Sequence, residues 1–450
     1  MIETATLHEV FDLTDPNANV LFDMSLEEAR DRVGSGHVEG VRQIEGHFAL
    51  VARDGQRVRM ARSLQVPMRY FIVKQRAGPA LVVAHRIDAI KRWLDERGLG
   101  DQFHPSYTRM VPAHHITEIA LVGCPDPNPV YHRFFSPRRE AWPGDLDAIG
   151  ARYIGALAAE IRKWLRGVPE HEPIGVSFSG GIDSGAVLLT LYHEICQLDL
   201  NPARLKAFTL SVGPGGGDLE QSRRFLATLD LQFLHEPVEV PPAYLDLREA
   251  VRVIEDYKPL DVQSGAMSLA LCRGIRERYA IWRYLVDGDG GDENLKDYPI
   301  EENAELTIRS VLHNLMLYHE GWGVDSIKHS LTYSGGLSRG CTRGFAPAAH
   351  YGFNLFSPFT LPNVVEVSEG IPFIDLTDWE HGRLYELKGE VVSRGIRAHT
   401  GVSMPVFEKR RFQHGALAEG RLASRLPQNP TAYRVLFQSI YDDSPPAGLG

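Results

Sequence analysis

The chain has 450 residues, of which 43% are hydrophobic and 24% charged, and its formal net charge is −10. This composition is ordinary for globular proteins and excludes a wholly disordered or fibrous chain. The acidic balance disfavours sequence-independent nucleic-acid binding, which depends on clustered basic charge. The length suits two or three domains.

Targeting and cysteine patterns point to the same class of protein. No apolar run approaches the roughly 20 residues needed to cross a bilayer, and the acidic start MIETATLHEVFDLTD lacks the order of a signal peptide. The four cysteines are scattered without a CxxC pair, which indicates neither a disulfide framework nor a cysteine zinc site. His381, His399 and His414 share no metal-ligand spacing. We expect a cytoplasmic enzyme without membrane or nucleic-acid partners.

Residues 1–135 contain short runs in which apolar and polar residues alternate. Breaks such as Asp54-Gly55 and Gly78-Pro79 separate these runs and are typical of hairpin turns. Alternation with a period of two is typical of strands that bury one face. We therefore predict a β-rich domain with an antiparallel sheet, whose strands cover residues 47–53, 57–62, 69–74 and 80–86.

Beyond residue 150 the pattern changes to strands and helices in alternation. A helical stripe covers 154–165, and predicted strands follow at 173–179, 205–212, 232–240 and 282–288. Helical patterns lie between them at 184–198, 218–229, 243–257 and 264–279. This alternation predicts βαβ units and a doubly wound parallel sheet of the α/β class. Residues 300–445 form a mainly helical C-terminal extension in this interpretation.

The motif SGGIDS at 179–184 lies between a predicted strand and a predicted helix. Its two glycines allow a ligand to approach the backbone, and the start of the helix offers free N–H groups to an anion. Asp183 would repel a bare phosphate, so the combination indicates a metal-bound polyphosphate. A plain glycine turn with a capped helix is the alternative.

The motif DGDGGDE at 287–293 also follows a predicted strand. Ligands of α/β sheets bind outside the carboxyl ends of the strands, so this loop and SGGIDS can meet at one site. Its four carboxylates repel one another unless solvent or a cation separates them. A surface loop is the alternative, whereas the spacing does not fit a calcium loop.

These motifs resemble the asparagine synthetase family of adenylating PP-loop enzymes, which includes β-lactam synthetases and lasso-peptide cyclases. The family's SGGxDS matches 179–184, its SGxGxDE-type loop matches 287–293, and its K-x-x-F-x-x-G motif matches 409–415. Weaker similarity covers 45–55, 213–229 and 339–359. The resemblance implies an N-terminal domain of degenerate Ntn-like type over residues 1–140 and a PP-loop synthetase domain over residues 141–450.

The resemblance also implies roles for individual residues, with ATP and Mg²⁺ as the ligands. Asp183 and Asp292 correspond to the ligands of magnesium pyrophosphate, and Lys409 to the lysine that stabilises the transition states. Lys388 corresponds to a second lysine that contacts pyrophosphate. The remaining ATP contacts are to phosphate, from Ser179, Gly180, Gly181 and Ser184, and to adenosine through the backbone, from Phe178, Ser211 and Gly288.

Position 289 differs among members of the family. Asparagine synthetases carry Glu there and β-lactam synthetases carry Tyr, in each case linked to the amine nucleophile. Asp289 is acidic, so we expect it to act as a general base or to bind a cationic amine. A loop residue that only tunes metal affinity is the alternative.

The nitrogen source is inferred from a departure from the family pattern. Glutamine-dependent members need a cysteine at the second position, whereas this sequence has Ile2, and its first cysteine is Cys124. We therefore expect no glutaminase activity and a preformed amine as the nucleophile.

The expected function is an ATP-dependent, AMP-forming ligase in specialised biosynthesis, such as an antibiotic pathway, with a small-molecule or peptide acid and amine as substrates. An ammonia-dependent asparagine synthetase and a non-catalytic nucleotide-binding homologue stay open. A homodimer or a pathway protein as partner stays open too.

Overall fold

The computed structural model describes residues 9–76, 78–120, 129–213, 216–297, 312, 341–408, 415–416, 426–427 and 429–441. Contacts between residues divide these into two compact units. The N-terminal unit lies within Met1–Ser136, and the C-terminal unit lies within Pro137–Leu315 and Thr342–Gly450. Among the described residues, no helix is both long and apolar enough to span a membrane.

The N-terminal unit contains two four-stranded sheets. The first has the order β1-β7-β6-β8, with β1 at Glu9–Asp12, β6 at Arg69–Gln75, β7 at Gly78–Ala84 and β8 at Arg109–Met110. The second has the order β10-β9-β5-β4, with β4 at Ala49–Asp54, β5 at Arg57–Arg62, β9 at His115–Ala120 and β10 at Val130–Arg133. The short strands β2 (Val20–Leu21) and β3 (Gly46–His47) pair with each other.

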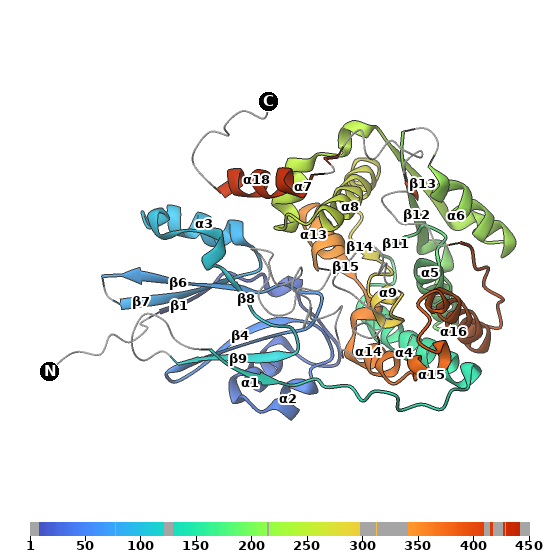
Figure 1. Ribbon diagram of the computed structural model, residues 1–450, viewed down its shortest axis with the longest axis horizontal. Helices are drawn as coiled ribbons and strands as arrows, with labels where there is room; N and C mark the ends of the chain where they lie inside the picture. Colours follow the sequence, from blue (N-terminus) through green and yellow to red (C-terminus); the bar gives the residue numbers. More distant parts are fainter. Residues whose placement is uncertain are drawn as a thin grey trace. The chain divides into compact units, whose positions relative to one another are not determined.

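Helices cover the outer faces of these sheets. Helix α1 (Leu26–Ser35), followed by α2 (Val38–Arg42), packs against β4 and β5, and α3 (Ile87–Asp95) packs against β6 and β7. In Figure 1 the unit therefore has four layers, with the two sheets between α3 and α1. The buried side of α3 presents Ile90, Trp93 and Leu94 to the apolar residues of β6 and β7.

The hairpins predicted around Asp54-Gly55 and Gly78-Pro79 are present, since β4 pairs with β5 and β6 with β7 in antiparallel register. One pairing departs from the expected antiparallel sheet. Strand β1 runs parallel to β7, with Phe11 opposite Val82. Alternation of residue type identifies a strand but carries no information about the direction of its neighbour, so the sequence pattern did not reveal this pairing.

The C-terminal unit is built around a five-stranded sheet of the order β13-β12-β11-β14-β15, in which every pair is parallel. The strands are β11 (Ile174–Ser177), β12 (Leu205–Val212), β13 (His235–Val240), β14 (Tyr284–Val286) and β15 (Asn354–Phe356). The helices that precede β15 are α4 (Leu146–Gly167), α5 (Ile182–Gln197), α6 (Gly217–Thr228), α7 (Leu247–Ile254), α8 (Pro259–Arg278), α9 (Gly291–Asn294) and α13 (Ala346–His350). After β15 come α14 (Pro362–Glu369), α15 (Phe373–Thr377), α16 (Arg383–Thr400) and α18 (Pro430–Tyr441).

The connections place helices on both faces of this sheet. Helices α5 and α6 lie on one side and α7 and α8 on the other (Figure 1). The chain runs outward from β11 through β12 to β13 and then returns to β14, on the other side of β11. The strand order therefore reverses between β11 and β14, and in open α/β sheets ligands bind at such a switch point.

The predicted α/β class with a parallel sheet is confirmed, and the predicted strands and helices between 154 and 288 are present with small shifts at their ends. Strand β15 was not foreseen, because it is only three residues long and lies in a segment with a mainly helical pattern.

Candidate active site

Two loops meet at the switch point, one after β11 and one after β14. Gly180, in the first loop, has φ +74°, and a side chain there would lie 2.9 Å from the backbone nitrogen of Ser222 in α6. Gly288, in the second loop, lies so close to the first that a Cβ would be 2.9 Å from the nitrogen of Ser184. Glycine at these positions lets the two loops touch each other and lets the first loop touch α6.

The first loop leaves polar groups available at the start of α5. The hydroxyls of Ser179 and Ser184 bond to each other and to backbone atoms of the loop at 3.3–3.4 Å, which is the long end of the hydrogen-bond range. Gly181 caps α5 without a side-chain hydrogen bond. A helix start with free N–H groups, two hydroxyls and close backbone is a favourable place for a phosphate group.

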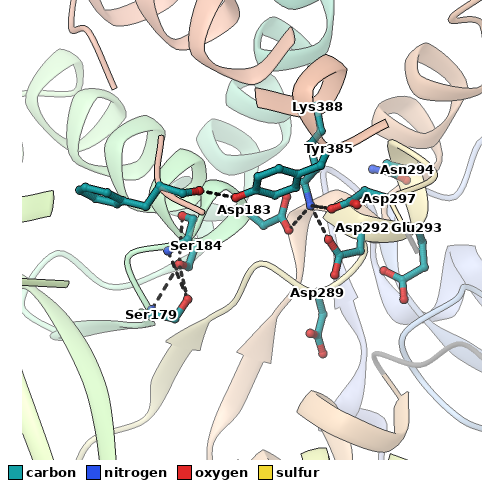
Figure 2. A network of polar contacts seen from close by, with 12 residues as sticks. Ser179, Asp183, Ser184, Asp289, Asp292, Glu293, Asn294, Asp297, Tyr385 and Lys388 are labelled. Carbon is teal, nitrogen blue, oxygen red and sulfur yellow. Dashed lines mark hydrogen bonds and ion pairs between the residues drawn. The ribbon is translucent and has the colours of Figure 1, made fainter. Parts of the chain in front are cut away.

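Asp183 and Asp292, which are roughly 110 residues apart in the sequence, converge on the ammonium group of Lys388 in α16. The Nζ of Lys388 donates to Asp183 Oδ2 at 2.6 Å and to Asp292 Oδ1, and it lies 3.6 Å from Asp297 Oδ2. Figure 2 shows these carboxylates around the lysine tip. The side chain of Lys388 is only 2% exposed, so a buried cation meets three carboxylates here, of which Asp183 and Asp292 are partly exposed.

The electrostatics of the cluster favour a cation between the two loops. Burial opposes the charged ammonium, but Asp183, Asp292 and Asp297 together hold the pKa of Lys388 well above its usual value. Carboxylate oxygens are the protein ligands that Mg²⁺ prefers. Because Asp183 and Asp292 already share one cation and stay partly exposed, at 21% and 35%, their geometry fits a shared magnesium ion.

A second group of charges lies at the base of the β14 loop. Asp287 and Asp289 are neighbours, with the backbone nitrogen of Asp289 donating to Asp287 Oδ1 at 3.2 Å. Burial raises the pKa of both carboxyls, and the charge of Asp289 raises that of Asp287 further. Arg343 lies 3.9 Å from Asp289 and acts in the opposite direction on its pKa. The side chain of Asp289 points away from Lys388 in Figure 2.

Buried contacts fix the end of this loop. Asn294 in α9 donates to the Tyr153 hydroxyl at 3.1 Å and to the carbonyl of Phe359 at 2.9 Å. Glu293 accepts from Arg343 at 3.0 Å. The backbone of Asp292 accepts from the nitrogen of Asp297 at 3.0 Å, which sets Asp297 beside Lys388.

The positions expected to touch adenosine lie on the same edge of the sheet. Phe178 follows β11 and packs edge-on against Phe225, with ring centroids 5.3 Å apart. Its side chain is thus part of the core, and its backbone nitrogen donates to the carbonyl of Phe208 at 2.8 Å. Ser211, at the end of β12, is buried and donates to the carbonyl of Gly213 at 3.3 Å.

Lys409 lies outside the described residues, but the structure describes the chain just before its motif and the two residues at the end of the motif and after it. Ala416, directly after the motif, accepts from the backbone nitrogen of Val212 at the end of β12, at 2.9 Å. Upstream, the Tyr385 hydroxyl donates to the carbonyl of Phe407. These two attachments tether the chain on either side of Lys409 to β12 and α16.

Asp297, Arg343 and Tyr385 were missed as candidates for this site. Asp297 follows the acidic motif by only four residues, which was a usable signal. Arg343 lies in the degenerate stretch 339–359, where no regular spacing singles it out. Tyr385 precedes Lys388 by three residues on α16, so the two side chains share one face of that helix.

Comparison with known families agrees with this geometry. Residues 167–334 match the family model Asparagine synthase. This segment of the chain therefore resembles the synthase domain of that family. The matched residues include both loops of the switch point, and members of the family are ATP-dependent ligases. No curated protein matches the chain.

Proposed function

We propose that this protein is an AMP-forming ligase that adenylates a carboxylate and condenses it with a preformed amine. The convergence of Asp183 and Asp292 on a single cation position carries the proposal. The two loops come from distant parts of the sequence, and their three carboxylates exceed the single positive charge of Lys388. An ATP-dependent ligase needs such a pair to hold magnesium pyrophosphate.

Each residue of the site has a role in this proposal. Asp183 and Asp292 would hold Mg²⁺, which when bound neutralises phosphate charge. The start of α5, with Ser179, Gly180, Gly181 and Ser184, would bind the phosphates. Lys388 would contact the departing pyrophosphate. Phe178, Ser211 and Gly288 would line the adenosine.

The reaction would take two steps. A carboxylate oxygen of the substrate attacks the α-phosphorus of ATP, and pyrophosphate leaves. The amine nitrogen then attacks the acyl carbon, AMP leaves, and the amine loses one proton. Asp289, whose carboxylate lies 3.9 Å from Arg343, would accept that proton, and Lys409 would stabilise negative charge in both transition states.

The products of ATP test the proposal. The protein is incubated with MgATP and a panel of amino acids and short peptides that carry both a carboxylate and an amine, and the products are separated. AMP, pyrophosphate and an amide are expected for the right substrate, whereas ADP and phosphate would contradict adenylation. Asparagine formed from aspartate and ammonium would favour an ammonia-dependent asparagine synthetase instead.

The role of Lys409 has its own test. Lys409→Ala should lower kcat on the order of 10²-fold or more, because a positioned charge acts mainly in the transition state. ATP affinity measured by calorimetry should change little. Lys206→Ala, which removes a partly exposed lysine of β12, is the matched control. Parallel loss of ATP binding and activity would make Lys409 a ground-state phosphate ligand.

A further inference from the structure

A second polar cluster lies on the same two helices as the Asp183–Lys388 contact, at their far ends. It consists of His193 and Glu194 in α5 and His399 in α16, and one potential ligand atom from each lies within 4.8 Å of the others. His399 Nε2 is 2.8 Å from Glu194 Oε1. The rings of His193 and His399 are 5.1 Å apart.

The spacing shows why the cluster forms. Glu194 follows Asp183 by eleven residues, and His399 follows Lys388 by eleven residues. Eleven residues make about three turns of helix and span about 16 Å. Helices α5 and α16 therefore run in the same direction, with one polar contact at the nucleotide loop and a second one three turns away.

The donor set is that of a transition metal. Two imidazoles and one carboxylate are a common set of protein ligands for zinc sites that keep a fourth position for water. Glu194 is fully buried, whereas both histidines are partly exposed, so an ion can enter from solvent. Hard cations such as Mg²⁺ prefer all-oxygen sites, which separates this cluster from Asp183 and Asp292.

The surroundings of Glu194 support a ligand role. Arg162 Nε donates to Glu194 Oε2 at 2.5 Å, while Oε1 faces His399. A ligating carboxylate usually has such an outer hydrogen bond on its second oxygen. A metal would take the place of the His399 proton between Nε2 and Oε1, with the imidazole proton moved to Nδ1. Arg162 would stay on Oε2.

We propose that His193, Glu194 and His399 form a zinc-class divalent metal site that links α5 to α16. Zinc bonds of about 2.0–2.2 Å place tetrahedral ligand atoms roughly 3.4 Å apart, so His399 Nε2 and Glu194 Oε1, now 2.8 Å apart, would have to separate slightly. The two histidine side chains are partly exposed, which gives them freedom to adjust.

Zinc titration of the full-length protein tests the site. Calorimetry with Zn²⁺, in millimolar Mg²⁺ to occupy oxygen sites, should give one equivalent bound. His193→Ala and His399→Ala should each weaken that binding at least about 100-fold, the upper range for loss of an outer-shell partner. Zn²⁺ should also raise the Tm of wild type but not that of the variants.

Two control variants separate this site from other zinc ligands. His171→Ala removes a histidine that is 84% exposed and lies outside the cluster, and Cys196→Ser removes the exposed thiol of α5. Both should keep wild-type zinc affinity. Co²⁺ should give a visible absorption band in wild type that weakens in both cluster variants.

Equal zinc affinity in wild type and the cluster variants would overturn the proposal, as would the absence of a stoichiometric event. Loss of binding in Cys196→Ser alone would assign zinc to the thiol and overturn it too. Calorimetry with MgATP shows that each variant is folded, and its outcome is independent of the zinc result.

Discussion

The two units bury positive charge in different ways. In the N-terminal unit the fully buried Arg62 donates to the backbone carbonyls of Val111, Ser63 and Leu64, at 2.6–3.2 Å. In the C-terminal unit the buried Lys388 faces three carboxylates. Neutral carbonyls hold the guanidinium by hydrogen bonds and add no formal charge of their own, whereas three carboxylates around one ammonium leave a net negative charge. The contacts of Arg62 therefore stabilise the fold, whereas the carboxylates around Lys388 favour the binding of a further cation.

Removal of carboxylates from the C-terminal cluster should have the largest effect. Asp183→Asn and Asp292→Asn should each lower turnover on the order of 10³-fold and weaken MgATP binding, because each removes a charge expected to face the metal. AMP release and calorimetry measure the two effects. Asp378→Asn, which alters a surface ion pair that is 74% exposed on the Asp side, should stay near wild type. Turnover within about threefold of wild type for both cluster variants would refute the metal assignment.

Loss of the buried guanidinium should affect stability alone. Arg62→Met leaves three carbonyls without their donor, and unsatisfied buried groups cost about 1–3 kcal/mol each. Since some will find other donors, we expect the free energy of unfolding to fall by about 3 kcal/mol in total. Urea unfolding measures this loss. MgATP affinity should not change. A parallel loss of MgATP affinity would contradict the claim that Arg62 serves stability alone.

Loss of the buried ammonium should affect stability in a magnesium-dependent way. Breaking a buried ion pair costs about 3–5 kcal/mol, and because Asp292 is about one-third exposed we expect Lys388→Met to cost about 2 kcal/mol. Millimolar Mg²⁺ should restore part of this stability, since the ion would neutralise the same carboxylates. Lys91→Met, which breaks a partly exposed pair in α3, should cost under about 1 kcal/mol with no response to magnesium. A Lys388→Met protein that does not respond to Mg²⁺ would count against the shared cation position.

The smallest effect should come from Arg343, as a shift in pH dependence. Arg343 lowers the pKa of Asp289 against the effect of burial, so Arg343→Met should raise that pKa. A base works only when deprotonated, so the acid limb of the kcat/KM profile should move to higher pH, with several-fold loss of rate near neutrality. Arg383→Met, at an exposed pair, is the control. An unmoved acid limb would mean that Asp289 is not the base.

The sequence allowed the two loops to be placed together, because strands that end in SGGIDS and DGDGGDE must share one edge of a parallel sheet. The resemblance to the asparagine synthetase family also singled out Lys388, which the structure places against Asp183 and Asp292. The pairing of Arg343 with Asp289 was out of reach, because it depends on how the short segment before β15 packs, and no periodic pattern encodes that. The position of Asp297 depends on the turn after α9, which a motif search does not follow.

The matched spacing on α5 and α16 makes helix length itself a constraint on this protein. Each residue turns an α-helix by about 100°, so one residue inserted between Lys388 and His399 would rotate one end of α16 away from its partner on α5. Either the ammonium would leave the two aspartates, or the imidazole would leave Glu194. The segment of α16 between these two contacts therefore tolerates substitution at its exposed positions but not insertion or deletion. Its length of about three turns fixes the distance between the two contacts.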